Sequence, residues 1–211
     1  MQLYHFRNDR YGLRSLREKR LRISRINELN DPFELVGCNL SDRDKRKAFQ
    51  VMKDKLNKDK GLLCFSASWR SPVQWAHYTD NHKGICMGFE VQDEFLMKVK
   101  YVNSRLKCSD KINAEYMQTI LSTKFSHWSY EKEHRVFLGL NHSEIEHGHY
   151  FEPFSDKLKL NKVIVGCNSE LKRIDIMTAL GKDEFDIEIF KARPAFGSFR
   201  IVRNQNEKLW T

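Results

Sequence analysis

The chain has 211 residues, 40% of them hydrophobic and 31% charged, with four prolines and ten glycines. This composition predicts a folded chain with one substantial core and excludes a disordered protein. The net charge of +9 favours acidic partners. No stretch approaches the roughly 20 apolar residues that span a bilayer, and the first residues lack the apolar core of a signal peptide, so we expect a cytoplasmic protein without membrane contact.

In the first half of the chain, hydrophobic patterning predicts strands at residues 2–6, 20–24, 62–65 and 85–91, and helices at 9–19, 41–59 and 72–78. Asn8 or Asp9 can cap the first helix, and Pro72 fits the first turn of the third. The Asn-Asp-Pro-Phe-Glu run at residues 30–34 breaks regular structure.

In the second half, we expect strands at 99–102, 134–140, 162–166 and 186–190, and helices at 109–125 and 169–180. Strands and helices interleave irregularly, and no internal repeat is present. The sequence therefore predicts an α+β fold with mixed or antiparallel sheets and peripheral helices, as a single domain over residues 1–211.

The five cysteines are spread singly, at positions 38, 64, 86, 108 and 167. No Cys-x-x-Cys spacing supports zinc, and nothing supports a disulfide framework. We therefore expect reduced, structural cysteines. The histidines and glutamates between His142 and His149 have irregular spacing that matches no common ligand motif, so no metal site is predicted there.

The most informative segment is residues 62–84, in which an apolar strand leads into a run of aromatic, hydroxyl and titratable side chains: Ser66, Ser68, Trp69, Trp75, His77, Tyr78, Asp80, Asn81, His82 and Lys83. Aromatic rings beside donors and acceptors suit a nucleotide or a similar flat polar ligand. A buried helix with polar ends explains the same residues, and the two interpretations stay open.

Basic side chains gather near the N-terminus. Residues 7–25 contain eight Lys or Arg residues against Asp9 and Glu18, and Arg10, Arg14 and Arg17 share one face of the predicted helix. Such a face could follow a phosphate backbone. A solvated helix face accounts for it equally well.

Three further clusters contain candidate site residues. Tyr4-His5-Phe6-Arg7 ends the first strand, and the turn at 30–34 contains Asp31 and Glu34, for which turn formation alone is sufficient. In the third cluster, Glu131 and Glu133 precede a strand at a spacing that places both carboxylates on one side. Two like charges raise a pKa, which suits general-base work or the stabilisation of a developing cation. A solvent-exposed strand face paired with Lys132 and Arg135 is the alternative.

Six blocks, in this order, resemble the bacterial domain-of-unknown-function family 2971: Leu3–Phe6, Asn30–Glu34, Cys64–Ser66, Trp75–Tyr78, Asn81–Gly84 and Tyr130–Arg135. The resemblance covers about the first two thirds of the chain and implies no reaction.

A more distant resemblance is to the Arg-Ser-Glu class of ADP-ribosyltransferases, which use NAD as substrate. It implies that Arg7 or His5 holds the NAD phosphates or ribose, that Ser66 and Ser68 shape the nicotinamide pocket, and that Trp75, Tyr78 and His82 complete it. Glu133 would stabilise the oxocarbenium-like transition state, and Glu131 would orient the acceptor, a nucleic acid or a protein. On this reading the protein is a toxin or phage-defence effector.

Two alternatives come from the residues themselves. One is a metal-dependent nuclease with Asp31, Glu34, Glu131 and Glu133 around Mg²⁺ on a basic surface. The other is a non-enzymatic nucleotide-binding or nucleic-acid-binding module that stacks bases on Trp69, Trp75 and Tyr78.

Overall fold

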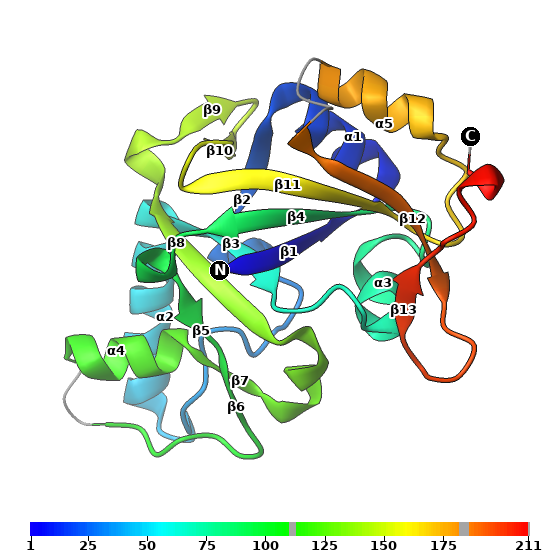
Figure 1. The fold of residues 1–211 in the computed structure, drawn as a ribbon. Helices are drawn as coiled ribbons and strands as arrows, with labels where there is room; N and C mark the ends of the chain where they lie inside the picture. Colours follow the sequence, from blue (N-terminus) through cyan, green and yellow to red (C-terminus); the bar gives the residue numbers. More distant parts are fainter. Residues whose placement is uncertain (110–112, 182–185, 211) are drawn as a thin grey trace. The chain divides into compact units, whose positions relative to one another are not determined.

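The computed structural model describes residues 1–109, 113–181 and 186–210, and it is a mixed α+β structure, which confirms the predicted fold class (Figure 1). The chain forms two compact units and passes between them after Leu21, Cys64, Glu94 and Glu152. The first unit contains Met1–Leu21, Phe65–Glu94 and Pro153–Thr211, and the second contains Arg22–Cys64 and Phe95–Glu152. That residues 1–211 form one domain stays a prediction.

The first unit is built on a mixed sheet in the order β13-β12-β11-β4-β1 (Figure 1). Its strands are β13 (Ile201–Arg203), β12 (Glu188–Pro194), β11 (Leu158–Val165), β4 (Ile85–Val91) and β1 (Gln2–Arg7). Strands β11 and β12 run parallel, and the other neighbouring pairs run antiparallel. The last residue of β3 (Lys60–Ser66) pairs with β1, where Ser66 lies opposite Tyr4.

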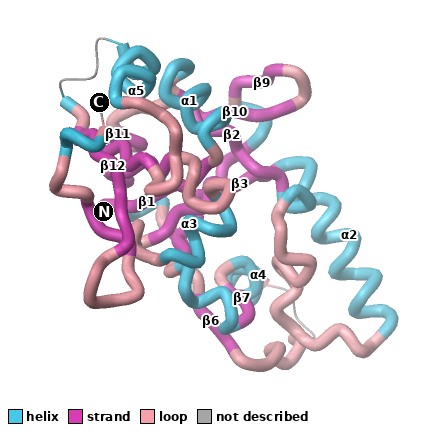
Figure 2. The backbone as a smooth tube through the Cα atoms, turned by 90° about the vertical axis from the view of Figure 1, so that its right-hand side faces the viewer, coloured by secondary structure: helices cyan, strands magenta, loops and turns pink. Residues whose placement is uncertain are grey.

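Helices cover both faces of this sheet. Helices α1 (Asp9–Glu18) and α5 (Arg173–Leu180) lie side by side on one face, and α3 (Pro72–Tyr78) lies on the other (Figures 1 and 2). The Asn8 side chain caps α1 by accepting a hydrogen bond from the backbone N–H of Tyr11, as predicted. Ser71 caps α3, and Pro72 occupies its first turn.

Alternate side chains of β1 pack into the core on the α3 side of the sheet. Tyr4 and Phe6 pack against a buried cluster formed by Trp69, Trp75, Cys86, Ile164, Phe190, Ala192 and Ile201. Because neighbouring strand residues point to opposite faces, Leu3 and His5 face the side of α1 and α5.

The second unit contains several short strand pairs. Strand β2 (Arg20–Arg25) pairs with β3, β8 (Glu133–Gly139) pairs with β3 and β5 (Met97–Lys98), β9 (Glu144–Glu146) pairs with β10 (His149–Pro153), and β6 (Lys100–Val102) pairs with β7 (Thr123–Phe125). Helices α2 (Arg43–Asp59) and α4 (Ala114–Leu121) complete it. One core cluster is centred on Leu62 and Leu35, and another on Phe49 and Ile120.

Most predicted elements are confirmed, with several corrections. Helix α5 begins at Arg173 and not at residue 169, and β5 was not predicted. The helix predicted at 109–125 is shorter, because Thr123–Phe125 leaves it to pair with β6; residues 110–112 of that prediction lie outside the described part. The connection around residues 144–153 contains the β9–β10 pair, and β13 was not predicted. In the part of the chain that the structure describes, no helix has the length and apolar character to cross a bilayer.

Candidate functional site

The two carboxylates predicted to be catalytic, Glu131 and Glu133, lie in the second unit within a buried network of ion pairs. The Lys124 Nζ atom lies 2.6 Å from Glu131 Oε2 and 2.9 Å from Glu133 Oε2. The Arg135 side chain, which is fully buried, lies 2.8 Å from Glu133 Oε1 and 2.7 Å from Glu34 Oε1. Three carboxylates therefore share two cations.

Local backbone geometry brings the two carboxylates together. Glu131 ends a 3-10 segment (Ser126–Glu131), and Glu133 begins β8. Between them, Lys132 has a left-handed backbone with φ of 47°. Both side chains reach Lys124, as the spacing predicted, although the chain between them turns instead of running extended.

The sequence led us to expect a raised pKa for these carboxylates, and the network does not give Glu133 one. Burial opposes ionisation of Glu133, but Arg135 and Lys124 outweigh it and hold the pKa of Glu133 at about 2. The expectation is therefore wrong for Glu133. At Glu34 burial outweighs the same two cations, and the pKa is raised.

This geometry suits a structural network better than a general base. A carboxylate with a pKa of about 2 has almost no affinity for a proton near neutral pH, so Glu133 is unsuited to proton abstraction. The network joins four segments of the second unit through their side chains, and Arg135 also donates to the Leu121 carbonyl. The alternative with Lys132 and an exposed strand face is corrected: Arg135 is a partner, but the face is buried.

The nuclease alternative draws on the same side chains. Glu34, Glu131 and Glu133 each lie within ion-pair distance of Lys124 or Arg135, so these cations already supply the charge that Mg²⁺ would bring. Asp31 accepts a hydrogen bond from the Phe33 backbone N–H, as expected for a turn residue. Among the described residues, no group of three or more His, Cys, Asp or Glu side chains is arranged to hold a metal ion.

Ser66, Ser68 and Trp75 lie in the first unit and hold the loop before α3. The Ser66 hydroxyl lies 3.1 Å from Gln74 Oε1 and accepts a hydrogen bond from the Ser68 N–H. Trp75 is fully buried, and its indole N–H donates to the Trp69 carbonyl at 2.6 Å. An indole ring buried in this way has no face free to stack on a base.

His5 and Arg7 lie on the opposite face of the sheet from Ser66. Arg7 Nε donates to His5 Nε2 at 3.0 Å, and the His5 ring lies 5.7 Å from that of Phe65. Because Ser66 pairs with Tyr4, it shares the α3 face. For His5, Arg7 and Ser66, contact with a ligand stays a prediction. The side chains of His5 and Ser66 do not converge, because they lie on opposite faces of the sheet.

The turn after α3 has an unusual backbone. Asp80, Asn81 and His82 are all left-handed, with φ of 48°, 55° and 68°. The turn fits closely against β11, because a Cβ at Gly166 would overlap the carbonyl of His82. Burial lowers the pKa of His82, and its Nδ1 atom is buried without a hydrogen-bond partner among the described residues. Such strain is often found at functional positions.

A second feature of the first unit is the exposed loop between β12 and β13. Together with the last two residues of β12 it is here called the aromatic hairpin (residues 193–200). Phe196 is 95% exposed and Phe199 is 99% exposed. The guanidinium carbon of Arg193 lies 4.2 Å from the centre of the Phe196 ring. The loop closes through Ala195 N–H to the Arg200 carbonyl, and it projects beyond β13 at the lower right of Figure 1.

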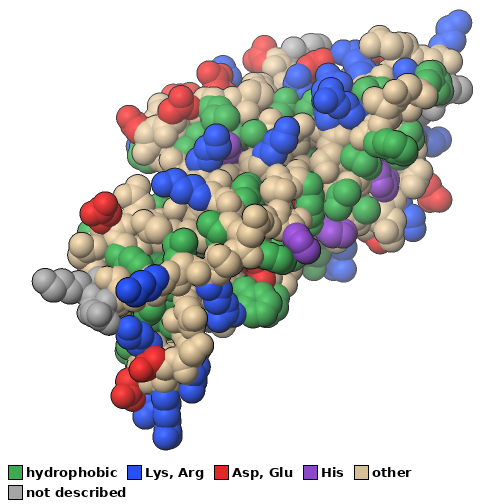
Figure 3. Space-filling model, turned by 90° about the horizontal axis from the view of Figure 1, so that it is seen from below, with side chains coloured by type: hydrophobic (Ala, Val, Ile, Leu, Met, Phe, Trp, Pro, Cys, Tyr) green, Lys and Arg blue, Asp and Glu red, His purple; other side chains and the backbone are tan. Residues whose placement is uncertain are grey.

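Charge alone does not locate a binding surface. Lys and Arg side chains are scattered over the face drawn in Figure 3 and do not form one large patch. On α1, Arg14 is paired with Glu18 at 2.7 Å, so the predicted basic face is partly neutralised. The aromatic hairpin differs from this background because two almost fully exposed phenyl rings lie together there, one of them beside an arginine.

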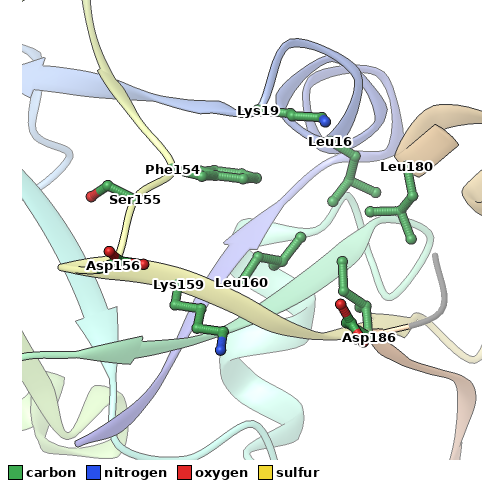
Figure 4. Close-up of a pocket in the computed structure, with 10 residues that line it drawn as sticks. Leu16, Lys19, Phe154, Ser155, Asp156, Lys159, Leu160, Leu180 and Asp186 are labelled. Atoms are coloured by element: carbon green, nitrogen blue, oxygen red, sulfur yellow. The ribbon is translucent and has the colours of Figure 1, made fainter. Parts of the chain in front are cut away.

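The first unit also has a pocket of about 300 Å³ beside α1 and β11 (Figure 4). Leu16, Leu160 and Leu180 converge on its apolar floor. Its polar lining combines two lysines with two aspartates: Lys19, Lys159, Asp156 and Asp186. Because these charges balance, the pocket favours neither an anionic nor a cationic ligand.

Comparison with known proteins finds a family model that matches part of the chain. Residues 74–136 match the model of a family described as "Protein of unknown function (DUF2971)". The chain is similar to that family over α3, the left-handed turn and both predicted catalytic carboxylates; the blocks at 3–6, 30–34 and 64–66 lie outside the match. No curated protein and no solved structure matches the chain. The resemblance to ADP-ribosyltransferases therefore stays a prediction.

Sequence reasoning missed the aromatic hairpin. A signal was present in Arg-Pro-Ala-Phe-Gly-Ser-Phe-Arg at residues 193–200, where two phenylalanines flank a Gly-Ser pair between arginines. Pro and Gly predict a turn here, and turns lie at the surface. Lys124 was also missed, since its partners are seven and nine positions away in sequence.

Proposed function

We propose that the protein binds single-stranded nucleic acid through the aromatic hairpin. The observation that carries this proposal is the nearly complete exposure of Phe196 and Phe199. Leaving two phenyl rings in water forgoes the stabilisation that their burial would give, and paired exposed aromatic rings favour a binding role. A phenyl ring offers a flat face on which any base can stack.

The charges around the two rings favour a nucleic acid as the partner. Arg193 and Arg200 bound the hairpin, and residues 193–200 contain no carboxylate. Arg193 lies over the Phe196 ring, so a planar guanidinium and a planar ring are presented together. Arg70 lies next to the end of the hairpin, because the carbonyl of Arg70 accepts a hydrogen bond from the Ile201 N–H. Cations beside aromatic rings can contact phosphates while bases stack.

A single strand fits this loop better than a duplex. In a duplex the base faces are covered by their neighbours, whereas a single strand can turn its bases outward onto side chains. The two rings lie three positions apart on a short loop, so each can take a base of the same strand. Binding of this kind needs no base-specific hydrogen bonds, and we expect little dependence on base sequence.

The test is the affinity of the full chain for a fluorescein-labelled oligothymidine, measured by anisotropy at low salt. Phe196→Ala and Phe199→Ala should each raise Kd by about 5- to 150-fold, because stacking of one base contributes about 1–3 kcal/mol. Tyr11→Ala is the matched control: Tyr11 is 48% exposed on α1 with Arg10 beside its ring, and its loss should leave Kd unchanged.

Two results would overturn the proposal. One is oligothymidine binding that survives the loss of both phenyl rings. The other is no oligothymidine binding at all, together with binding of the hairpin to vesicles of anionic lipid, which would make the rings a membrane contact.

A second candidate function, the transfer of ADP-ribose from NAD, rests on the sequence resemblance, with Glu133 as its candidate residue. Glu133 is held ionised by Arg135 and Lys124, and a fixed carboxylate can stabilise positive charge that develops on a ribose. The test is release of nicotinamide from NAD by the wild-type chain, with Glu133→Gln as the inactive variant. No release in the presence of protein and nucleic-acid acceptors would reject this candidate.

A further inference from the structure

We propose that Cys38 and Cys108 form a reversible disulfide when the protein meets a peroxide. Both residues lie in the second unit, and their sulfur atoms are 3.7 Å apart. This modification site is independent of the aromatic hairpin, which belongs to the first unit. It changes the sequence-based expectation that all five cysteines are only structural.

The backbone holds the two thiol-bearing segments in register. Cys38 forms an isolated parallel bridge with Leu106. Backbone hydrogen bonds of 2.8 Å flank it on both sides, from Asn39 N–H to the Leu106 carbonyl and from Leu106 N–H to the Gly37 carbonyl. The sulfurs must approach by about 1.7 Å to reach the bonded distance, and small rotations of the two side chains can supply this movement.

The surroundings assign different roles to the two sulfurs. Cys38 is fully buried in the cluster with Phe49 and Ile120, and burial raises the pKa of its thiol. Cys108 is half-buried, so a small oxidant can reach it. We therefore assign first attack to Cys108 and resolution to Cys38.

The chemistry balances with hydrogen peroxide as the two-electron oxidant. The Cys108 thiol loses its proton and its sulfur attacks one peroxide oxygen. The O–O bond breaks, a sulfenic acid forms, and the leaving hydroxide takes up that proton as water. Cys38 then attacks the Cys108 sulfur, the S–O bond breaks, and a second water leaves as the disulfide forms. In sum, two thiols and one peroxide give one disulfide and two waters, and an external dithiol reverses the reaction by exchange.

The bond would close a long loop, since the two cysteines are 70 positions apart. Closing a loop of this length restricts the unfolded chain, so we expect oxidation to raise Tm by roughly 5–15 °C. The effect should disappear on addition of dithiothreitol.

The experiment treats the folded full chain with hydrogen peroxide and maps cysteine linkages by mass spectrometry under non-reducing conditions. The expected product joins the peptides of Cys38 and Cys108 with the loss of two hydrogen atoms, and it is lost in Cys108→Ser. Cys167→Ser, which removes a cysteine of the first unit, should form the same product as the wild type.

Oxidation of Cys108 to sulfinic acid without any link to Cys38 would overturn the proposal, as would a link between other cysteines in the folded chain. Because Cys38→Ser changes a buried core position by itself, Cys108→Ser is the deciding variant, and its Tm before oxidation checks that it folds.

Discussion

Glu133 accepts hydrogen bonds from both Lys124 and Arg135, so its carboxylate compensates two buried cations at once. Replacing it by glutamine would leave both cations short of negative charge in the interior. We expect Glu133→Gln to lower the free energy of unfolding by about 3 kcal/mol. The measurement is urea unfolding followed by circular dichroism.

Glu115→Gln is the matched control for this substitution, because Glu115 is exposed in the first turn of α4. Its loss should cost no more than about 0.5 kcal/mol. Equal stability of Glu133→Gln and the wild type would show that the network contributes no stability and would strengthen the case for a catalytic carboxylate.

The pKa of Glu133 also predicts how stability depends on pH. Its folded pKa of about 2 lies below the ordinary value of 4.5, so the folded state binds this proton less tightly than the unfolded state. The resulting stabilisation is complete above about pH 5 and is lost as pH falls toward 2. Urea unfolding at a series of pH values should therefore show a steeper decline below pH 5 in the wild type than in Glu133→Gln. Parallel curves would contradict the assignment.

Whether the surroundings of a residue could be predicted depends on how far away in sequence its contacts lie. The spacing of Glu131 and Glu133 predicted that both carboxylates face one side, and both reach Lys124. The extended backbone assumed for that prediction is wrong, because Lys132 is left-handed. Their cations come from another strand and from Glu133's own strand, and the burial that decides the pKa arises only when these segments pack. Charge patterning therefore predicted the pair but not the direction of its pKa shift.

At the scale of elements, the left-handed turn after α3 depends on a close approach by the end of β11. The Gly166 N–H donates to the Gly84 carbonyl, and a Cβ at Gly166 would overlap the carbonyl of His82. We expect Gly166→Ala to lower the free energy of unfolding by about 2 kcal/mol, because the backbone must shift to admit a methyl group. Gly197→Ala, where a Cβ meets nothing within 4 Å, is the control. If both variants lose equal stability, the close fit is not what fixes the turn.

Elements with local signals were predicted well, and those that depend on distant partners were not. Helix α3 has the predicted bounds because Ser71 and Pro72 mark its start within its own sequence. Thr123–Phe125 was assigned to a helix because its partner, β6, lies more than 20 positions earlier, and no local pattern reveals that pairing. β13 was missed for the same reason, since three residues carry little periodicity.

For the whole molecule, composition gives the net charge of +9 but does not show which surface binds a partner. Basic side chains are spread over the surface drawn in Figure 3, so binding by charge alone would have no preferred position. The aromatic hairpin supplies that position. The hairpin lies at one edge of the sheet, because it joins the edge strand β13 to its neighbour β12.

Binding at the aromatic hairpin should depend on salt to a limited extent. If Arg70, Arg193 and Arg200 contact phosphates, log K for oligothymidine should fall with log salt at a slope of about −2, since each phosphate of a single strand contributes about −0.7. Arg193→Gln with Arg200→Gln should reduce the slope to about −0.7. Arg22→Gln with Arg25→Gln, in the second unit, should leave it unchanged, and a slope lowered equally by both pairs would show that binding is spread over the surface.

Binding at the aromatic hairpin is tested most directly by ultraviolet crosslinking of the full chain to oligothymidine, followed by identification of the crosslinked peptides. Because stacked rings and bases lie in contact, we expect crosslinks on the peptide that contains Phe196 and Phe199. Crosslinks confined to other peptides, while the aromatic hairpin stays unmodified, would contradict it.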